Sequence, residues 1–184
     1  MLAKFGGRPI IEAVLDNLRE APVDEIIAVV GADAERLREV CERHSVRTVA
    51  NEEWEWGQST SVVAGLRASG GRAAVVLLGD QPFVGAEAVA RLVAAFAEEA
   101  KVAVATYGGK RRNPVLFSRE IWPLLKAELA GDEGARSFLR RHPELVVEVP
   151  CDGVGDPVDV DTREDLRRLE EMRGPLSDYK MAGG

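Results

Sequence analysis

The sequence predicts an α/β fold in which helices cover both faces of a mostly parallel sheet. Helical and strand patterns alternate over residues 10–50, which is typical of parallel strands joined by right-handed helical crossovers. A run of six apolar residues at 73–78 predicts a strand buried on both faces. The length of 184 residues suits one domain with a single substantial core. We expect that domain to span residues 1–172, with 173–184 as a loose tail.

Composition and charge exclude several classes of protein. Hydrophobic residues make up 46% of the chain and charged residues 30%, an ordinary soluble mixture. No apolar run reaches the ~20 residues of a membrane helix and no signal peptide opens the chain, so we expect no membrane partner. The net charge of -7 argues against nucleic acid as a partner. Cys41 and Cys151 lie far apart without a CxxC motif, which indicates neither a zinc site nor a disulfide framework and favours a cytoplasmic location.

The first elements alternate between helix and strand. Pro9 suits a first helical position, and apolar residues at helical spacing predict a helix over residues 10–18. We expect a strand at 25–30, a second helix capped by Asp33, and another strand at 46–50. His44 lies near the end of the second helix, where we expect it to interact with the helix dipole rather than to act in catalysis.

Residues 51–61 predict a loop that leads into the next helix. Its last residues, 57–61, read Gly-Gln-Ser-Thr-Ser. Small hydroxyl residues at a helix start leave backbone N–H groups that face outward, so this segment is either a ligand site or an ordinary N-cap. The two tryptophans of the loop are expected to pack on the domain itself.

The strand at 73–78 ends abruptly at Gly79 and Asp80, and Pro82 prevents its continuation. In open α/β sheets, ligands bind beyond the carboxyl ends of the strands. Asp80 is therefore a candidate metal ligand, beside a glycine that lets a ligand approach the backbone. The alternative is a loop residue that caps the next helix or turns the chain, and the strand alone does not separate the two.

The second half of the chain predicts four further helices and four further strands. We expect helices at 86–100, 119–129 and 132–142, and strands at 102–107, 114–117, 145–149 and 158–161. Residues 108–113 predict a tight basic turn. A capping-box pattern at 162–165 starts a final helix, so Asp161 stands at a strand end like that of Asp80.

Three predicted features converge on one edge of the sheet: Asp80, Asp161 with its neighbour Asp159, and the helix start at 57–61. Two carboxylates at one edge repel each other unless a cation joins them, and hard oxygen ligands suit Mg²⁺. Mg²⁺ takes its remaining ligands from water and substrate phosphates, which is the arrangement that nucleotidyl transfer requires.

Six pieces of sequence stand in a specific order and spacing. They are FGGRPII at 5–11, WGQSTSVVAGL at 56–66, LGDQP at 78–82, YGG at 107–109 with NPVLF at 113–117, DEGAR at 132–136 and VDVDTREDL at 158–166. With these pieces the chain resembles the MobA/MocA-like nucleotidyltransferases, the molybdenum-cofactor branch of the NTP-transferase fold, as far as about Leu169. The resemblance implies a three-layer Rossmann-like fold of the GT-A type.

The resemblance also implies a reaction. CTP would be joined to the phosphate of molybdopterin with release of pyrophosphate, in molybdenum cofactor biosynthesis. Asp80 and Asp161 would be the catalytic metal ligands for Mg²⁺, with Asp159 as a further candidate. The nucleotide would be bound by Gly57, Gln58, Ser59, Ser61 and Gly79.

On the acceptor side, the resemblance implies roles for Gly109, Lys110 and Asn113. Lys110, Arg111 or Arg112 could attract an anionic pterin phosphate, although surface arginines are commonly just solvated. Many relatives resemble Gly-His-Pro at 112–114, and Asn113 departs from that pattern. The LGDQP form looks more MocA-like than MobA-like, which favours CTP over GTP.

The front of the chain departs from the family. The family begins with a strand, the neighbour of the one that carries Asp80, and with a glycine-rich phosphate loop that ends in a lysine. Met1 lies just after that lysine, so Lys4 is not given its role. The explanations are a start assigned at an internal methionine, a trimmed chain, or a degraded relative without activity. The persistence of Asp80 and Asp161 favours the first two.

Two rival functions remain open. One is a non-catalytic accessory protein that binds nucleotide or molybdenum cofactor and delivers it to a molybdoenzyme or its chaperone. The missing loop favours this function, whereas the two aspartates weigh against it. The other is a nucleotidyltransferase that uses GTP or another acceptor, such as a sugar phosphate, and the compact length weighs against a sugar acceptor.

Overall fold

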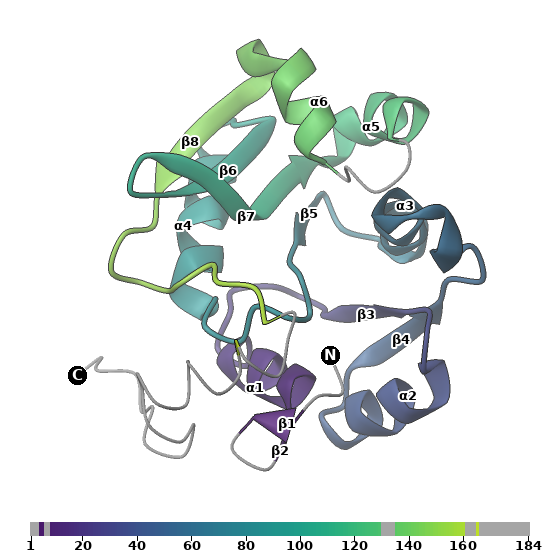
Figure 1. Cartoon of the computed structure of the whole chain (residues 1–184). Coiled ribbons are helices and arrows are strands. Elements are labelled where there is room, and N and C mark those ends of the chain that lie inside the picture. The colour runs from purple at the N-terminus through teal and green to yellow at the C-terminus, as the bar shows by residue number, and fades with distance from the viewer. Residues whose placement is uncertain (1–3, 6–7, 130–134, 161–164, 166–184) are drawn as a thin grey trace.

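The computed structural model describes residues 4–5, 8–129, 135–160 and 165 (Figure 1). The strands are β1 Lys4–Phe5, β2 Arg8–Pro9, β3 Ile27–Val30, β4 Arg47–Ala50, β5 Ala73–Val76, β6 Val102–Tyr107, β7 Lys110–Ser118 and β8 Val146–Pro150. The helices are α1 Ile10–Asn17, α2 Ala34–Arg43, α3 Gln58–Ala68, α4 Ala86–Ala97, α5 Trp122–Glu128 and α6 Arg136–Arg141. Short 3-10 turns are η1 Trp54–Trp56, η2 Arg119–Ile121 and η4 Pro143–Leu145. Asp161, residues 132–134 and the expected tail at 173–184 lie outside the described residues.

Within the described residues, the strands form three sheets. β3 and β4 pair in parallel, with Ile27 opposite Arg47. The largest sheet has the order β5-β7-β6-β8, in which β6 and β8 are parallel and β7 is antiparallel to β5 and β6. β1 and β2 form a short antiparallel pair. Parallel and mixed sheets flanked by helices confirm the predicted Rossmann-like α/β class (Figure 1).

The strand that contains the apolar run at 73–78 differs from its prediction. β5 covers only Ala73–Val76, and its residues are half-buried. It pairs antiparallel with β7, with Val75 opposite Leu116. In the described part of the chain no ladder connects β5 to β3, so the two sheets remain separate. Both faces of β5 are covered, because Ala74 and Val76 pack against one core cluster and Val75 packs against the opposite ones. The expected parallel pairing was wrong, because an apolar run specifies a strand whereas its neighbours depend on contacts far along the chain.

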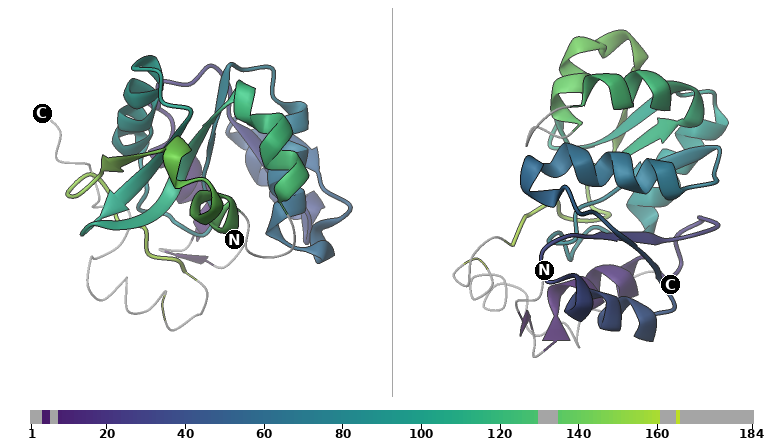
Figure 2. Two further views of the ribbon diagram at one scale, coloured as in Figure 1. Left: turned by 90° about the horizontal axis from the view of Figure 1, so that it is seen from above. Right: turned by 90° about the vertical axis from the view of Figure 1, so that its right-hand side faces the viewer.

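Each face of the largest sheet has its own core. Side chains alternate along β6 and β7, so Val104 and Phe117 face one side while Ala103 and Leu116 face the other. The first side packs against α3, α5 and α6, and the second packs against α4 (Figure 2). A further cluster joins α1 and α2 to β3 and includes the half-buried Leu77, which also packs against the α4 side. Side-chain packing therefore links the two sheets.

Most of the helices and strands predicted before residue 130 are confirmed, with boundary shifts of a few residues. Three local predictions are corrected. Residues 110–113 belong to β7, so the basic turn is reduced to Gly108 and Gly109, both with positive φ. Residues 158–160 are not part of a strand. Asp33 precedes α2 in the left-handed conformation and makes no capping hydrogen bond through its side chain.

Candidate functional site

The candidate site is centred on the turn that follows β5. Leu77 and Leu78 continue from the strand, and Gly79 and Asp80 turn the chain towards α4. Asp80 is half-buried, and its Oδ1 atom is fully enclosed. The turn is anchored from α1, because Asn17 Nδ2 donates a hydrogen bond to the carbonyl oxygen of Pro82 (2.5 Å).

A second segment, residues 155–160, lies antiparallel to the turn. Gly155 forms a bridge with Val84, and the N–H of Asp156 donates to Phe83 O at 3.1 Å. At the other end, the N–H of Val160 donates to Asp80 O at 3.0 Å. A Cβ at position 155 would lie 2.9 Å from Phe83 O, so this close approach requires glycine. Segment 155–160 is thereby aligned against the turn that contains Asp80.

Gln81 connects the two segments through its side chain. It is only 3% exposed, and its Nε2 donates to Asp159 Oδ1 at 2.6 Å and to Pro157 O at 3.2 Å. The structure therefore places Asp159 against the residue that follows Asp80. Asp161, the other predicted ligand, is not placed because it lies outside the described residues.

The donor chemistry of this region fits a hard divalent cation. Asp80 and Asp159 provide carboxylate oxygens on two segments that are hydrogen-bonded to each other. In the described residues, no group of three or more His, Cys, Asp or Glu side chains could hold a metal ion. Mg²⁺ is commonly bound through one or two protein carboxylates, and it takes its remaining ligands from water and substrate phosphates.

The start of α3 is organised by Asn51 at the end of β4. Asn51 Nδ2 donates to Thr60 Oγ1 at 2.8 Å and to Ser61 Oγ at 3.0 Å, and its Oδ1 accepts the N–H of Glu53 at 3.1 Å. The Thr60 hydroxyl also lies 2.8 Å from Gly57 O, the residue before the helix. Asn51 was not among the predicted site residues, although a polar residue directly after a strand is the same signal that indicated Asp80.

The predicted nucleotide-binding residues differ in accessibility. Gln58 is exposed, Ser59 is buried, and Ser61 is half-buried against Asn51. Gly57 has a φ of 107°, a conformation that favours glycine. Beside this helix start is a cavity of about 580 Å³ between the end of β4, α3 and Leu129. Ser59 lines this cavity, whereas Gly57, Gln58, Ser61, Gly79 and Asp80 do not.

The loop tryptophans behave differently from each other. Trp54 packs directly on Gly31 at the end of β3, where an added Cβ would lie 2.5 Å from Trp54 Cβ. Trp56 is 78% exposed, so it does not pack on the domain as expected. The expectation is met in part by Trp54, which contacts Gly31 but remains 44% exposed, and it is wrong for Trp56.

The predicted acceptor-side residues lie on and beside the β6–β7 hairpin. Gly109 forms the turn, Lys110 is exposed at the start of β7, and Asn113 precedes a cis peptide bond to Pro114. The neighbouring Arg111 is paired with Glu148 at 2.8 Å, which leaves it less able to attract an anion.

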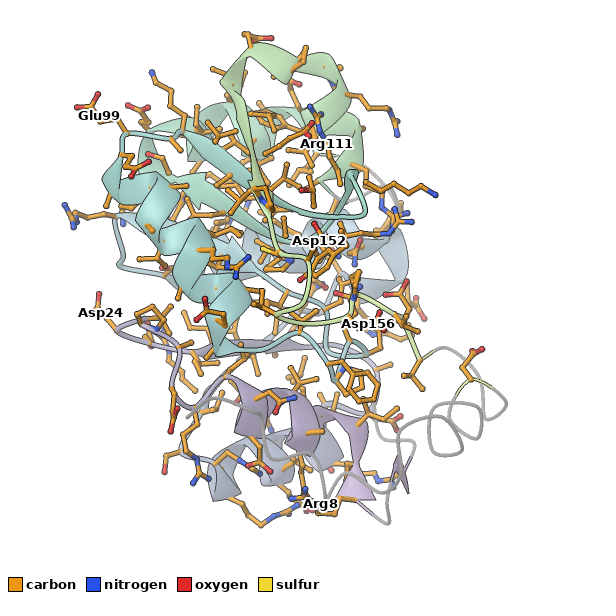
Figure 3. All side chains as sticks on the ribbon, turned by 90° about the vertical axis from the view of Figure 1, so that its left-hand side faces the viewer. Arg8, Asp24, Glu99, Arg111, Asp152 and Asp156 are labelled. Atoms are coloured by element: carbon orange, nitrogen blue, oxygen red, sulfur yellow. The ribbon has the colours of Figure 1, made fainter. Side chains whose placement is uncertain are left out.

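The hairpin and segment 155–160 lie on the same side of the molecule. Figure 3 shows Arg111, Asp152 and Asp156 in succession along this side. The N–H of Gly108 donates to Asp152 Oδ1 at 2.7 Å, which ties the hairpin turn to the chain that leads into segment 155–160. Tyr107, the last residue of β6, reaches Gly155 with its hydroxyl group. Burial raises the pKa of this hydroxyl well above its ordinary value.

The chain is a nucleotidyltransferase with a Rossmann-like domain, as its family and its structural neighbours show. The chain belongs to the MobA-like NTP transferase domain family, whose model matches residues 1–146.

Similar proteins support this assignment. Nicotine blue oxidoreductase of Paenarthrobacter nicotinovorans is 28% identical over 176 residues, which cover 91% of this chain and 86% of that protein. The bifunctional protein GlmU of Symbiobacterium thermophilum is 30% identical over 97% of this chain, which corresponds to 33% of GlmU.

Among solved structures, Rv0371c of Mycobacterium tuberculosis H37Rv in complex with manganese has a TM-score of 0.80 at 28% identity, covering 92% of this chain and 90% of that one. The homologue from Mycobacterium sp. strain JC1 has a TM-score of 0.81 at 30% identity, covering 93% and 86%. The family and the manganese-bound neighbour are consistent with a nucleoside triphosphate substrate and a divalent metal. No helix in the described part of the chain is long and apolar enough to cross a bilayer.

Proposed function

We propose that this protein is a Mg²⁺-dependent nucleotidyltransferase that joins CMP from CTP to the phosphate of a molybdopterin-type acceptor. An acceptor phosphate oxygen attacks the α-phosphorus of CTP, and the new P–O bond forms as the bond to pyrophosphate breaks. The observation that carries the proposal is the pairing of segment 155–160 with the turn that contains Asp80, because it brings carboxylates from distant parts of the chain to one strand end.

Each part of the site has a role in this reaction. Asp80, with Asp159 or Asp161, would hold the divalent ion, which supplies positive charge against the triphosphate and the departing pyrophosphate. The helix start at 57–61 would bind the nucleotide through backbone N–H groups. Lys110 on the hairpin would attract the anionic acceptor, so that the two phosphates approach each other in a fixed geometry.

CTP is favoured over GTP by the LGDQP sequence at 78–82, which resembles the MocA-like branch. Two similar proteins add support by their names. A relative from Alteromonas mediterranea, 25% identical over 77% of this chain, is a 3-deoxy-manno-octulosonate cytidylyltransferase. A neighbour of similar fold, at 13% identity, was solved in complex with CTP.

The test compares Asp80→Asn with the matched control Asp24→Asn. Asp24 is exposed on the loop after α1, away from segment 155–160 (Figure 3). We expect Asp80→Asn to reduce Mg²⁺-dependent pyrophosphate release by at least about a hundredfold. The substitution removes a negative charge that would hold the divalent ion, and this ion neutralises the phosphates in the transition state. Asp24→Asn should retain wild-type release. Normal turnover by a folded Asp80→Asn protein would contradict the metal assignment.

Nucleotide and acceptor identity are tested by thermal unfolding. A ligand at a hundred times its Kd stabilises a protein by about 2.7 kcal/mol, so CTP and GTP should be distinguished in the presence of Mg²⁺. We expect a Mg²⁺-dependent shift with CTP. A shift without pyrophosphate release, in the presence of molybdopterin, would favour the accessory-protein function. Release with a sugar phosphate instead would show a different acceptor.

A further inference from the structure

Gln81 is a buried polar residue whose position packing alone does not explain. Its side chain is 3% exposed, yet its Oε1 atom is buried and has no hydrogen-bond partner among the described residues. A buried acceptor without a donor destabilises the folded state, and an apolar side chain of similar size would avoid this loss. The hydrogen bonds donated by the Gln81 amide nitrogen indicate why a polar residue occupies this position.

The orientation of the Gln81 amide is determined by its surroundings. Nε2 lies 2.6 Å from Asp159 Oδ1 and 3.2 Å from Pro157 O, and both of these atoms only accept hydrogen bonds. If the amide were turned over, its oxygen would face two other oxygens. Nitrogen therefore faces segment 155–160, and the short distance to a carboxylate is that of a charge-assisted hydrogen bond.

A glutamine is chemically suited to support a metal-binding carboxylate. Its amide donates a proton to one oxygen of Asp159 and contributes no positive charge, so the carboxylate keeps its full negative charge. Lysine or arginine at this position would compete with a cation. Residues that hold a ligand in this way typically change metal affinity by about 10- to 100-fold when removed.

We propose that Gln81 is a positioning residue that holds Asp159, and with it segment 155–160, in the orientation that binds the divalent ion beside Asp80. This inference rests on the proposed function, because it assigns the metal to the same strand end. It also assigns Asp159 a defined part in metal binding, in place of the role of a solvated carboxylate beside the site.

The experiment measures Mn²⁺ binding to the full chain by electron paramagnetic resonance of the free ion. The test variant is Gln81→Met, which keeps the length of the side chain and removes its donor. The matched control is Gly31→Ala, because the added Cβ disturbs the packing of Gly31 on Trp54 and touches neither the turn nor Asp159. Thermal unfolding of both variants reports stability separately.

We expect Gln81→Met to raise the Kd for Mn²⁺ by about 10- to 100-fold, as is typical when a residue that holds a metal ligand in place is removed. The apparent KM for metal in pyrophosphate release should rise by a similar factor, while kcat recovers at saturating metal. Gly31→Ala should lower the melting temperature and leave the Kd for Mn²⁺ unchanged. In an Asp159→Asn background, Gln81→Met should have little further effect, because both changes disturb one interaction.

Other outcomes overturn the inference. An unchanged Kd for Mn²⁺ in a destabilised Gln81→Met protein would show that the residue only stabilises the turn. If Gln81→Met does not fold, Gln81→Asn decides, since it keeps the amide but is too short to reach Asp159. Failure of the proposed function is recognised separately, because wild-type protein would then bind no Mn²⁺ or Asp80→Asn would bind it equally well.

Discussion

Replacing Asn51 should disconnect the start of α3 from the end of β4. The Asn51 side chain is 6% exposed and makes three hydrogen bonds, to Thr60 Oγ1, Ser61 Oγ and the N–H of Glu53. At about 1 kcal/mol for each bond, Asn51→Ala should lower the free energy of unfolding by about 3 kcal/mol. That is a large share of the 5–15 kcal/mol of stability of a typical domain.

Asn51→Asp separates the two roles of the side chain. A carboxylate can still accept the N–H of Glu53, but it cannot donate to the hydroxyls of Thr60 and Ser61. We expect a smaller loss than that of Asn51→Ala at neutral pH, because the Ser61 hydroxyl can turn to donate to the carboxylate, whereas the Thr60 hydroxyl already donates to Gly57 O. Glu52→Gln is the matched control, because Glu52 is the exposed neighbour of Asn51 in the same loop.

Urea denaturation measures these differences, followed by fluorescence of the nearby tryptophans at 54 and 56. Because α3 begins at the proposed nucleotide site, the Kd for CTP should also rise in both Asn51 variants. If the free energy of unfolding of Asn51→Ala lies within about 0.5 kcal/mol of the wild-type value, the reasoning is refuted, because substitutions at ordinary surface positions give changes of that size.

Two further predictions concern packing and pH. Gly31→Ala should destabilise the protein by about 1–3 kcal/mol, because the new Cβ would lie 2.5 Å from Trp54 Cβ and overpack that contact. A shift in Trp54 fluorescence should accompany the loss, and wild-type stability would contradict the close packing. The hydrogen bond from His142, with a contribution from Arg141, holds the pKa of Glu128 below its ordinary value of 4.5. The carboxylate therefore stabilises the fold above pH 4.5, and this stabilisation is lost as pH falls through the lowered folded-state pKa. Glu128→Gln should have a lower melting temperature than wild type at pH 7 and converge with it in acid; a constant difference down to pH 3 would contradict the pairing.

The amino-acid sequence by itself determined the local elements and the family. Apolar residues at helical spacing predicted α1, and continuous apolar runs predicted β5 and β6, because these signals depend on neighbours within a few positions. Asp80 was recognised by the same local reasoning, since the strand before it and Pro82 after it define a strand end. The family was recognised from six short pieces of sequence and is confirmed by the match to residues 1–146.

Only the tertiary structure decided which of these elements meet. β5 lies half-buried beside β7, and its apolar sequence carries no information about which strand pairs with it or in which direction. Gln81 and Asp159 are 78 positions apart, and the bond between them appears only when segment 155–160 folds back along the turn after β5. A long-range hydrogen bond of this kind leaves no periodic signal in either segment. For that reason the sequence points to the acidic residues of the proposed site, whereas only the structure reveals the glutamine that is hydrogen-bonded to one of them.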